Sequence, residues 1–120
     1  MMMDVLEALR VRFAALPGVA SARIGLEPNI SPADYPLVRI VPDRITPAAY
    51  GKREAECSIF FGVPIATSEG LDAVYTALFA LESAIIAAVR AHGGRYLETI
   101  TDSDRLDTYK MMAVRCRVEG

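Results

Sequence analysis

Residues 69–90 carry a continuous helical pattern, and this stretch limits what the rest of the chain can form. Thr67 or Ser68 is placed to cap its start, and His92-Gly93-Gly94 is typical of a helix end. At 1.5 Å per residue the helix is about 33 Å long, so we expect a sheet of similar length to cover its apolar face. The apolar side chains that recur at helical spacing are Leu71, Val74, Tyr75, Leu78, Leu81, Ile85 and Val89.

Strand patterns occupy much of the remaining chain. In REAECSIFFGV, residues 53–63, apolar side chains alternate with Glu54, Glu56 and Ser58, which is typical of a sheet with one packed face. Residues 27–36 contain three prolines and predict a loop. The residues SDRL join the last two strands in a hairpin-like link. The other predicted strands are residues 19–25, 37–41, 95–102 and 107–118.

An amphipathic helix opens the chain. Asp4 and Glu7 fit a capping box, in which each side chain binds a backbone N–H at the helix start. Pro17-Gly18 ends the pattern. The apolar positions at helical spacing are Leu6, Leu9, Phe13 and Leu16.

These elements follow the order α-β-β-β-α-β-β. The order predicts an α+β two-layer sandwich, in which a mostly antiparallel sheet of about five strands carries two helices on one face. The length of 120 residues fits a single domain over residues 1–120.

The chain offers little for catalysis or cofactor binding. His92, the only histidine, lies in a helix end, where the helix dipole favours it. Cys57 and Cys116 alternate with apolar residues in predicted strands, so we expect two reduced, buried thiols. The sequence has no nucleophile-elbow pattern and no glycine-rich phosphate loop. We therefore expect no enzyme, no cofactor and no metal site.

Composition narrows the classes of partner. The formal net charge of −2 argues against a primary nucleic-acid binder. The first residues lack the features of a signal peptide, so we expect a cytoplasmic protein.

Residues 69–90 are long enough to cross a membrane, but Asp72 and Glu82 would lie inside the span. Insertion of an acidic residue at the centre of a membrane span costs about 2.5 kcal/mol or more. We weigh a neighbouring subunit on the alanine-rich second side of this helix against an ordinary solvated helix.

Arginines and aspartates supply candidate contacts with another chain. Arg39, Arg115 and Arg117 alternate with apolar neighbours and would form an outward arginine facet, which Arg23 would join. Such a facet fits an acidic partner, including the hairpin of another copy, although an ordinary solvated face is the alternative. The small acidic cluster around the last hairpin consists of Asp102, Asp104 and Asp107. A solvated turn is the alternative for this cluster, and the residues required for a calcium loop are not in place.

Residues 42–53, PDRITPAAYGKR, look too broken for a strand or a helix and too long for a simple turn. Most connections in a compact domain have about 4–6 residues, and longer ones are often functional. We interpret this segment as an arm that contacts a partner, with a mobile connector as the alternative. Its candidate contact residues are Asp43, Arg44, Ile45, Tyr50 and Arg53.

The whole pattern resembles a known family. An opening helix ends in LPGV, the segment EPNISPADYPLVRIVPDR is broken by prolines, ECSIFFGV leads to the alanine-rich helix, and DTYKMMAVRCRVEG supplies the last strand. Over nearly the full chain, this ordering is similar to the small tail-terminator and tail-completion (minor tail) proteins of long-tailed bacteriophages and prophages. The similarity lies in the order of elements rather than in a fixed motif.

The resemblance implies a non-enzymatic assembly protein. Family members form a ring, commonly of six copies, that caps the tail tube, stops its growth and offers a surface to the head. The implied partners are further copies of the chain, the tail tube protein and a head-completion protein, without membrane or sequence-specific nucleic acid. The implied location is the host cytoplasm during assembly and then the virion tail. The alternatives are a head-completion or connector component, and a small cellular α+β ligand-binding or regulatory domain that dimerises.

Overall fold

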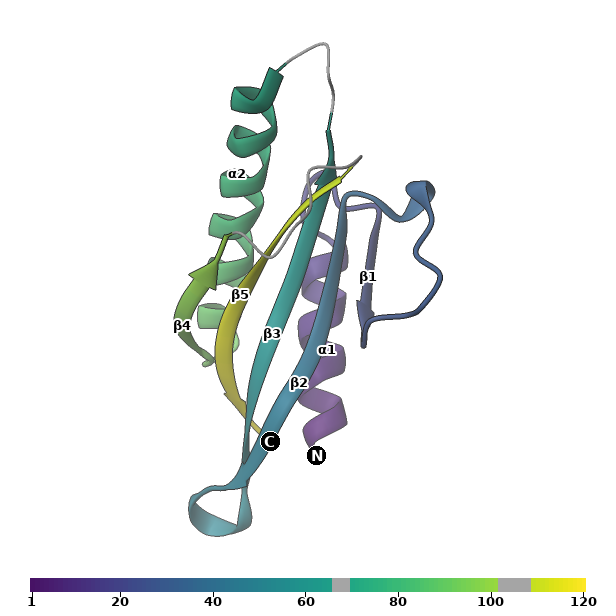
Figure 1. Ribbon diagram of the computed structural model, residues 1–120. Helices are drawn as coiled ribbons and strands as arrows, with labels where there is room; N and C mark the ends of the chain where they lie inside the picture. Colours follow the sequence, from purple (N-terminus) through teal and green to yellow (C-terminus); the bar gives the residue numbers. More distant parts are fainter. Residues whose placement is uncertain (66–69, 102–108) are drawn as a thin grey trace.

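The computed structural model describes residues 1–65, 70–101 and 109–120 (Figure 1). Within these residues the elements follow the order α-β-β-β-α-β-β, so the predicted α+β class is confirmed. The helices are α1 (Met2–Ala14) and α2 (Gly70–Ala91). The strands are β1 (Ser21–Ile24), β2 (Leu37–Pro47), β3 (Arg53–Pro64), β4 (Arg95–Ile100) and β5 (Tyr109–Glu119). Short 3₁₀ turns occupy Pro32–Asp34 and Ala49–Gly51.

The strands form one mixed sheet in the order β1-β2-β3-β5-β4. β1 pairs with β2 in parallel, and every other pair of neighbours is antiparallel. Because β3 and β4 are both antiparallel to β5, they run in the same direction, and α2 forms the crossover between them. The predicted mostly antiparallel sheet is therefore correct, with a parallel pair at the β1 edge.

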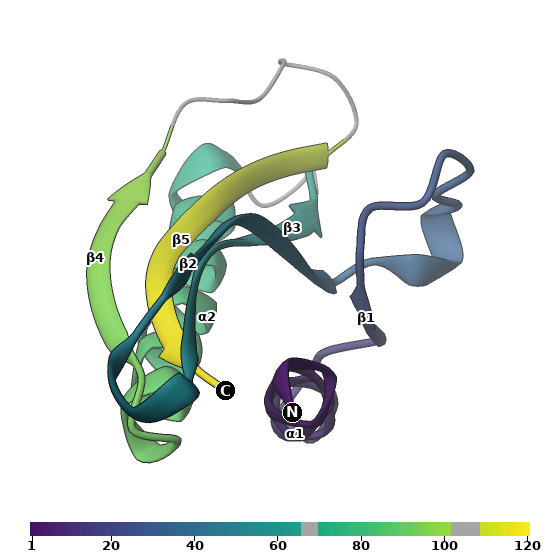
Figure 2. The ribbon, with the colours of Figure 1, turned by 90° about the horizontal axis from the view of Figure 1, so that it is seen from below.

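Both helices pack on the same face of this sheet, and β4 and β5 curve around α2 (Figure 2). Most of the predicted apolar stripe of each helix is confirmed as buried. The exceptions are Leu71, which is 52% exposed, and Leu16 and Tyr75, which are partly buried, Leu16 lying beyond the end of α1. Ala88 of α2 is also buried. The strand residues that complete the core include Val38, Ile40, Cys57, Ile59, Phe61, Met112, Val114 and Cys116. Alternation in the sequence therefore identifies the packed face of each long strand correctly.

The predicted start of α1 differs from the structure, whereas the predicted end of α2 agrees with it. The capping box at Asp4 and Glu7 is wrong, since α1 begins at Met2 and Glu7 accepts a hydrogen bond from Arg10 instead. Met2 is buried at the end of the apolar stripe of α1, so packing extends the helix beyond the local capping pattern. Gly93 adopts φ +76° after α2, and the Gly94 N–H donates to the Val89 carbonyl at 2.9 Å, as expected for a glycine cap. Thr67 and Ser68 lie outside the described residues.

The largest correction concerns residues 42–53. β2 continues to Pro47 and β3 begins at Arg53, so this segment is the end of a long β2–β3 hairpin, here called the hairpin arm (Figure 1). β1 pairs only with Leu37–Ile40, which leaves the rest of β2 at an edge of the sheet. Proline is tolerated on edge strands and at bulges, and the register shifts between Pro42 and Arg44. The hairpin arm helps to make the molecule elongated, with extents of 53 × 25 × 24 Å.

Candidate interaction surfaces

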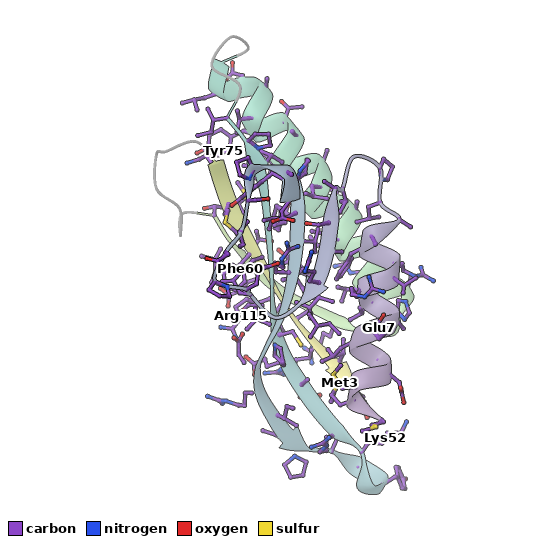
Figure 3. All side chains as sticks on the ribbon, turned by 90° about the vertical axis from the view of Figure 1, so that its right-hand side faces the viewer. Met3, Glu7, Lys52, Phe60, Tyr75 and Arg115 are labelled. Carbon is purple, nitrogen blue, oxygen red and sulfur yellow. The ribbon has the colours of Figure 1, made fainter. Side chains whose placement is uncertain are left out.

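The sheet face away from the helices carries the arginines that the sequence singled out. Phe60 and Arg115 lie on this outer face (Figure 3). The register places Arg39 between Arg23 on β1 and Phe60 on β3, and it places Arg115 opposite Ser58. The segment between β1 and β2 brings Glu27 and Tyr35 against part of the same face.

Arg39 is on the predicted face but is fully buried, which corrects its assignment as an outward residue. Its Nε donates to Glu27 Oε1 at 2.6 Å, and its Nη1 donates to Ser21 Oγ and to the Val38 carbonyl, each at 3.0 Å. The second Glu27 oxygen lies 3.4 Å from Nε of the exposed Arg23. The hydrogen bond from Arg39 lowers the pKa of Glu27, with smaller contributions from the positive charges of Arg39 and Arg23. Arg39 is therefore paired within its own chain rather than presented to another.

Arg115 and Arg117 are also paired within the chain. Arg115 Nη2 donates to Glu56 Oε1 at 2.7 Å, and Arg117 Nε lies 3.8 Å from carboxylate oxygens of both Glu54 and Glu56. Ser58 Oγ donates to Asp43 beside them. This part of the outer face is a compensated set of charges, not the free arginine facet that the sequence suggested. The polar alternation of β3 and β5 was visible in the sequence, but the adjacency of these two strands was not.

The hairpin arm presents side chains that have little contact with the rest of the chain. Tyr50 is fully exposed, and Ile45 is 44% exposed. Among the described residues, none forms an ion pair with Arg44, Lys52 or Arg53. The hairpin arm holds three basic residues and one acidic residue, so its formal charge is +2. Because the formal net charge of the whole chain is −2, the residues outside the hairpin arm sum to −4.

One side of α2 combines acidic and apolar residues. Asp72, Tyr75, Phe79, Glu82 and Ile86 recur every three or four residues and therefore share this side, here called the α2 acidic flank. Phe79 is 47% exposed, and its ring stacks on that of Tyr75 with the centroids 6.0 Å apart. Among the described residues, Asp72 and Glu82 have no ion-pair partner. Sequence reasoning named both acids only as obstacles to membrane insertion.

The alanine-rich side of α2 borders an apolar groove of about 340 Å³. Ala77, Ala80 and Ala84 line it from α2, and Pro17 and Val19 line it from the segment after α1. By length and composition alone, α2 also qualifies as a membrane span. In the structure its core stripe packs against the sheet and against α1.

Two further features of the described residues are an ion pair on α1 and a pair of buried cysteines. A shallow hollow of about 530 Å³ between α1 and β1 contains the Glu7–Arg10 ion pair, in which the hydrogen bond from Arg10 lowers the pKa of Glu7.

Cys57 and Cys116 are free, buried and directly opposite each other on β3 and β5, as expected for reduced thiols. Their mutual hydrogen bond and their burial raise the pKa of Cys116. Over residues 1–65, 70–101 and 109–120, His, Cys, Asp and Glu side chains form no group of three suited to a metal ion.

The predicted acidic cluster of Asp102, Asp104 and Asp107 lies outside the described residues.

The fold and the surfaces that are described define a small α+β protein with a projecting hairpin and two helices on one face of a five-stranded sheet. No protein-family model matches the chain, and no curated protein sequence matches it significantly. The resemblance to tail-terminator proteins is therefore a hypothesis that rests on the order of elements.

Proposed function

We propose that this protein is a non-enzymatic assembly subunit of the tail-terminator or tail-completion type. Copies of the chain join into a closed ring, six copies being the expected number, on the end of a phage or prophage tail tube. The ring stops growth of the tube and offers a surface to a head-completion protein. Assembly takes place in the host cytoplasm, and the ring remains in the virion tail.

The observation that carries this proposal is the hairpin arm. An aromatic side chain that is fully exposed at the end of a projecting hairpin gains nothing for the folded monomer, because it buries no surface there. The same segment holds three basic residues, and none of them forms an ion pair among the described residues. Side chains of this kind, Tyr and Arg above all, are enriched where proteins contact each other.

A ring requires a subunit with two different contact surfaces, because head-to-tail packing joins one patch to another. The hairpin arm and α2 are separate parts of the molecule, and each exposes apolar side chains. A symmetric dimer requires only one self-complementary patch. The cellular dimer is therefore the weaker alternative, although the apolar groove beside α2 is one feature that suits a ligand-binding domain.

Native mass spectrometry and light scattering over a wide range of protein concentrations test the proposal. We expect a closed oligomer of fixed size, with six copies as the leading expectation, and a ring with a central opening in electron micrographs. A dimer that never grows would favour the cellular domain. A protein that stays monomeric up to millimolar concentration would count against self-assembly as its function.

A further inference from the structure

The hairpin arm projects from one end of the molecule and exposes Tyr50 and Ile45. Lys52, at its end, lies at the opposite end of the molecule from Tyr75 of α2 (Figure 3). The backbone of the hairpin arm is already ordered by pairing between β2 and β3, with Ile45 opposite Ala55 and Pro47 opposite Arg53. A preordered segment loses less conformational entropy on binding than a flexible loop does.

The α2 acidic flank has the complementary chemistry. Its two acids enclose an apolar centre, since Phe79 lies between Asp72 and Glu82 along the helix. No basic residue occurs in α2 before Arg90. Lys110 of β5 packs over the Tyr75 ring at 5.3 Å but is itself only 4% exposed, so it adds little positive surface. The flank therefore offers an exposed aromatic ring with negative charge on both sides.

We propose that the hairpin arm of one copy docks on the α2 acidic flank of a second copy. Tyr50 and Ile45 pack against Phe79, and the cations of the hairpin arm meet Asp72 and Glu82. The inference deepens the proposed function, because it names the subunit contact of the ring and rests on self-assembly. Opposite charges around an aromatic centre fix the register of such a contact and suppress wrong partners.

Charge decides between this docking surface and the groove on the other side of α2. The groove is lined by Pro, Gly, Val, Leu and Ala residues and gives the cations of the hairpin arm no partner. Charge also favours a second copy as the occupant, since everything outside the hairpin arm sums to −4. The two surfaces do not overlap, so each copy can use both at once, as a closed ring requires.

A charge-swap experiment on the full chain tests the contact. We expect Lys52→Glu and Glu82→Lys, made in separate chains, each to weaken self-association by about tenfold or more. An equimolar mixture of the two variants should recover assembly, because each contact in the mixture again joins opposite charges. Arg12→Glu, which reverses an exposed charge on α1, is the matched control and should assemble normally. Sedimentation velocity at low and high salt measures each case, with circular dichroism as the check on folding.

A second measurement covers the case in which Glu82→Lys does not fold. Tyr50→Cys and Phe79→Cys chains, mixed and oxidised, should form a disulfide-linked pair between copies, while Tyr50→Cys mixed with Val11→Cys should not. If all charge variants assemble normally and this cross-link does not form, the proposed contact is wrong, whereas the proposal that the chain forms a ring is unaffected. A wild-type chain that never associates would overturn both proposals.

Discussion

Glu27 Oε1 lies 2.6 Å from Nε of Arg39, and this ion pair ties the segment between β1 and β2 to the buried part of the outer sheet face. β1 has only four residues and pairs with β2 alone. Arg39 also binds Ser21 at the start of β1, so one buried guanidinium connects three pieces of the chain. This ion pair therefore supports the edge of the sheet in addition to the pairing of β1 with β2.

Glu27→Ala should destabilise the protein strongly. The substitution leaves the Arg39 charge buried without its anion, which costs about 3–5 kcal/mol in comparable cases. Urea unfolding followed by circular dichroism measures the loss. Arg23→Ala is the control, because Arg23 reaches the same carboxylate from an exposed position and should contribute about 0–1 kcal/mol. Similar losses for the two variants would show that burial does not decide the strength of this pair.

The same ion pair predicts a dependence of stability on acid. The pKa of Glu27 is below its ordinary value of 4.5 in the folded protein, so its contribution is fully present above that value. The contribution is lost as the pH falls through the lowered pKa, because protonation breaks the pair. Glu27→Gln should therefore flatten the decline of the free energy of unfolding below pH 4.5. The backbone N–H of Ser31 lowers the pKa of Asp34 as well, so Asp34→Asn is the parallel variant that separates the two carboxylates.

Periodicity in the sequence predicted the order of the elements and their packed faces, but not the full length of β2. The stripe from Leu6 to Phe13 and the alternation from Cys57 to Val63 each report burial directly, because side-chain direction follows the period of the backbone. Long-range pairing was not available from the same signal. Nothing local to Arg115 indicates that Glu56 faces it from β3, and nothing local to Arg39 indicates that Glu27 folds over it.

The hairpin arm was predicted wrongly because its position in the sheet cannot be read from the local sequence. Pro42, Pro47 and Gly51 predict an interruption, and the local rule is sound for a central strand. β2 becomes an edge strand beyond Ile40, where proline is acceptable, and this depends on the short length of β1. The sequence did not indicate the α2 acidic flank for a different reason. Its acidic and apolar residues are ordinary for a surface helix, and they suggest a contact only when they are compared with the positive charge of the hairpin arm.

Gly62 should not tolerate a side chain. A Cβ at this position would lie 2.8 Å from Met111 Cγ, 3.1 Å from Tyr35 Cε2 and 3.2 Å from the Lys110 carbonyl oxygen. Gly62→Ala is expected to lower the free energy of unfolding by about 1–3 kcal/mol, as is typical of overpacking. Thermal unfolding measures the change.

A double-mutant cycle identifies the cause of that loss. Met111→Ala removes the nearest atom, so Gly62→Ala should cost less in the Met111→Ala background by about 0.5 kcal/mol or more. Equal costs in both backgrounds would assign the effect to the backbone of β3 rather than to the contact with Met111.

Tyr50 should separate stability from assembly. It is the one described residue other than glycine with a positive φ, +58°, and a left-handed backbone costs an ordinary side chain roughly 1–2 kcal/mol. Asn tolerates this conformation, so Tyr50→Asn should leave the free energy of unfolding unchanged or raise it by up to about 1 kcal/mol. The monomer loses no packing, because the Tyr50 side chain is fully exposed. Self-association should nevertheless weaken, since the aromatic ring is the proposed centre of the contact with α2. Unfolding in urea and sedimentation velocity on the same sample check both halves, and unchanged assembly would remove Tyr50 from the interface.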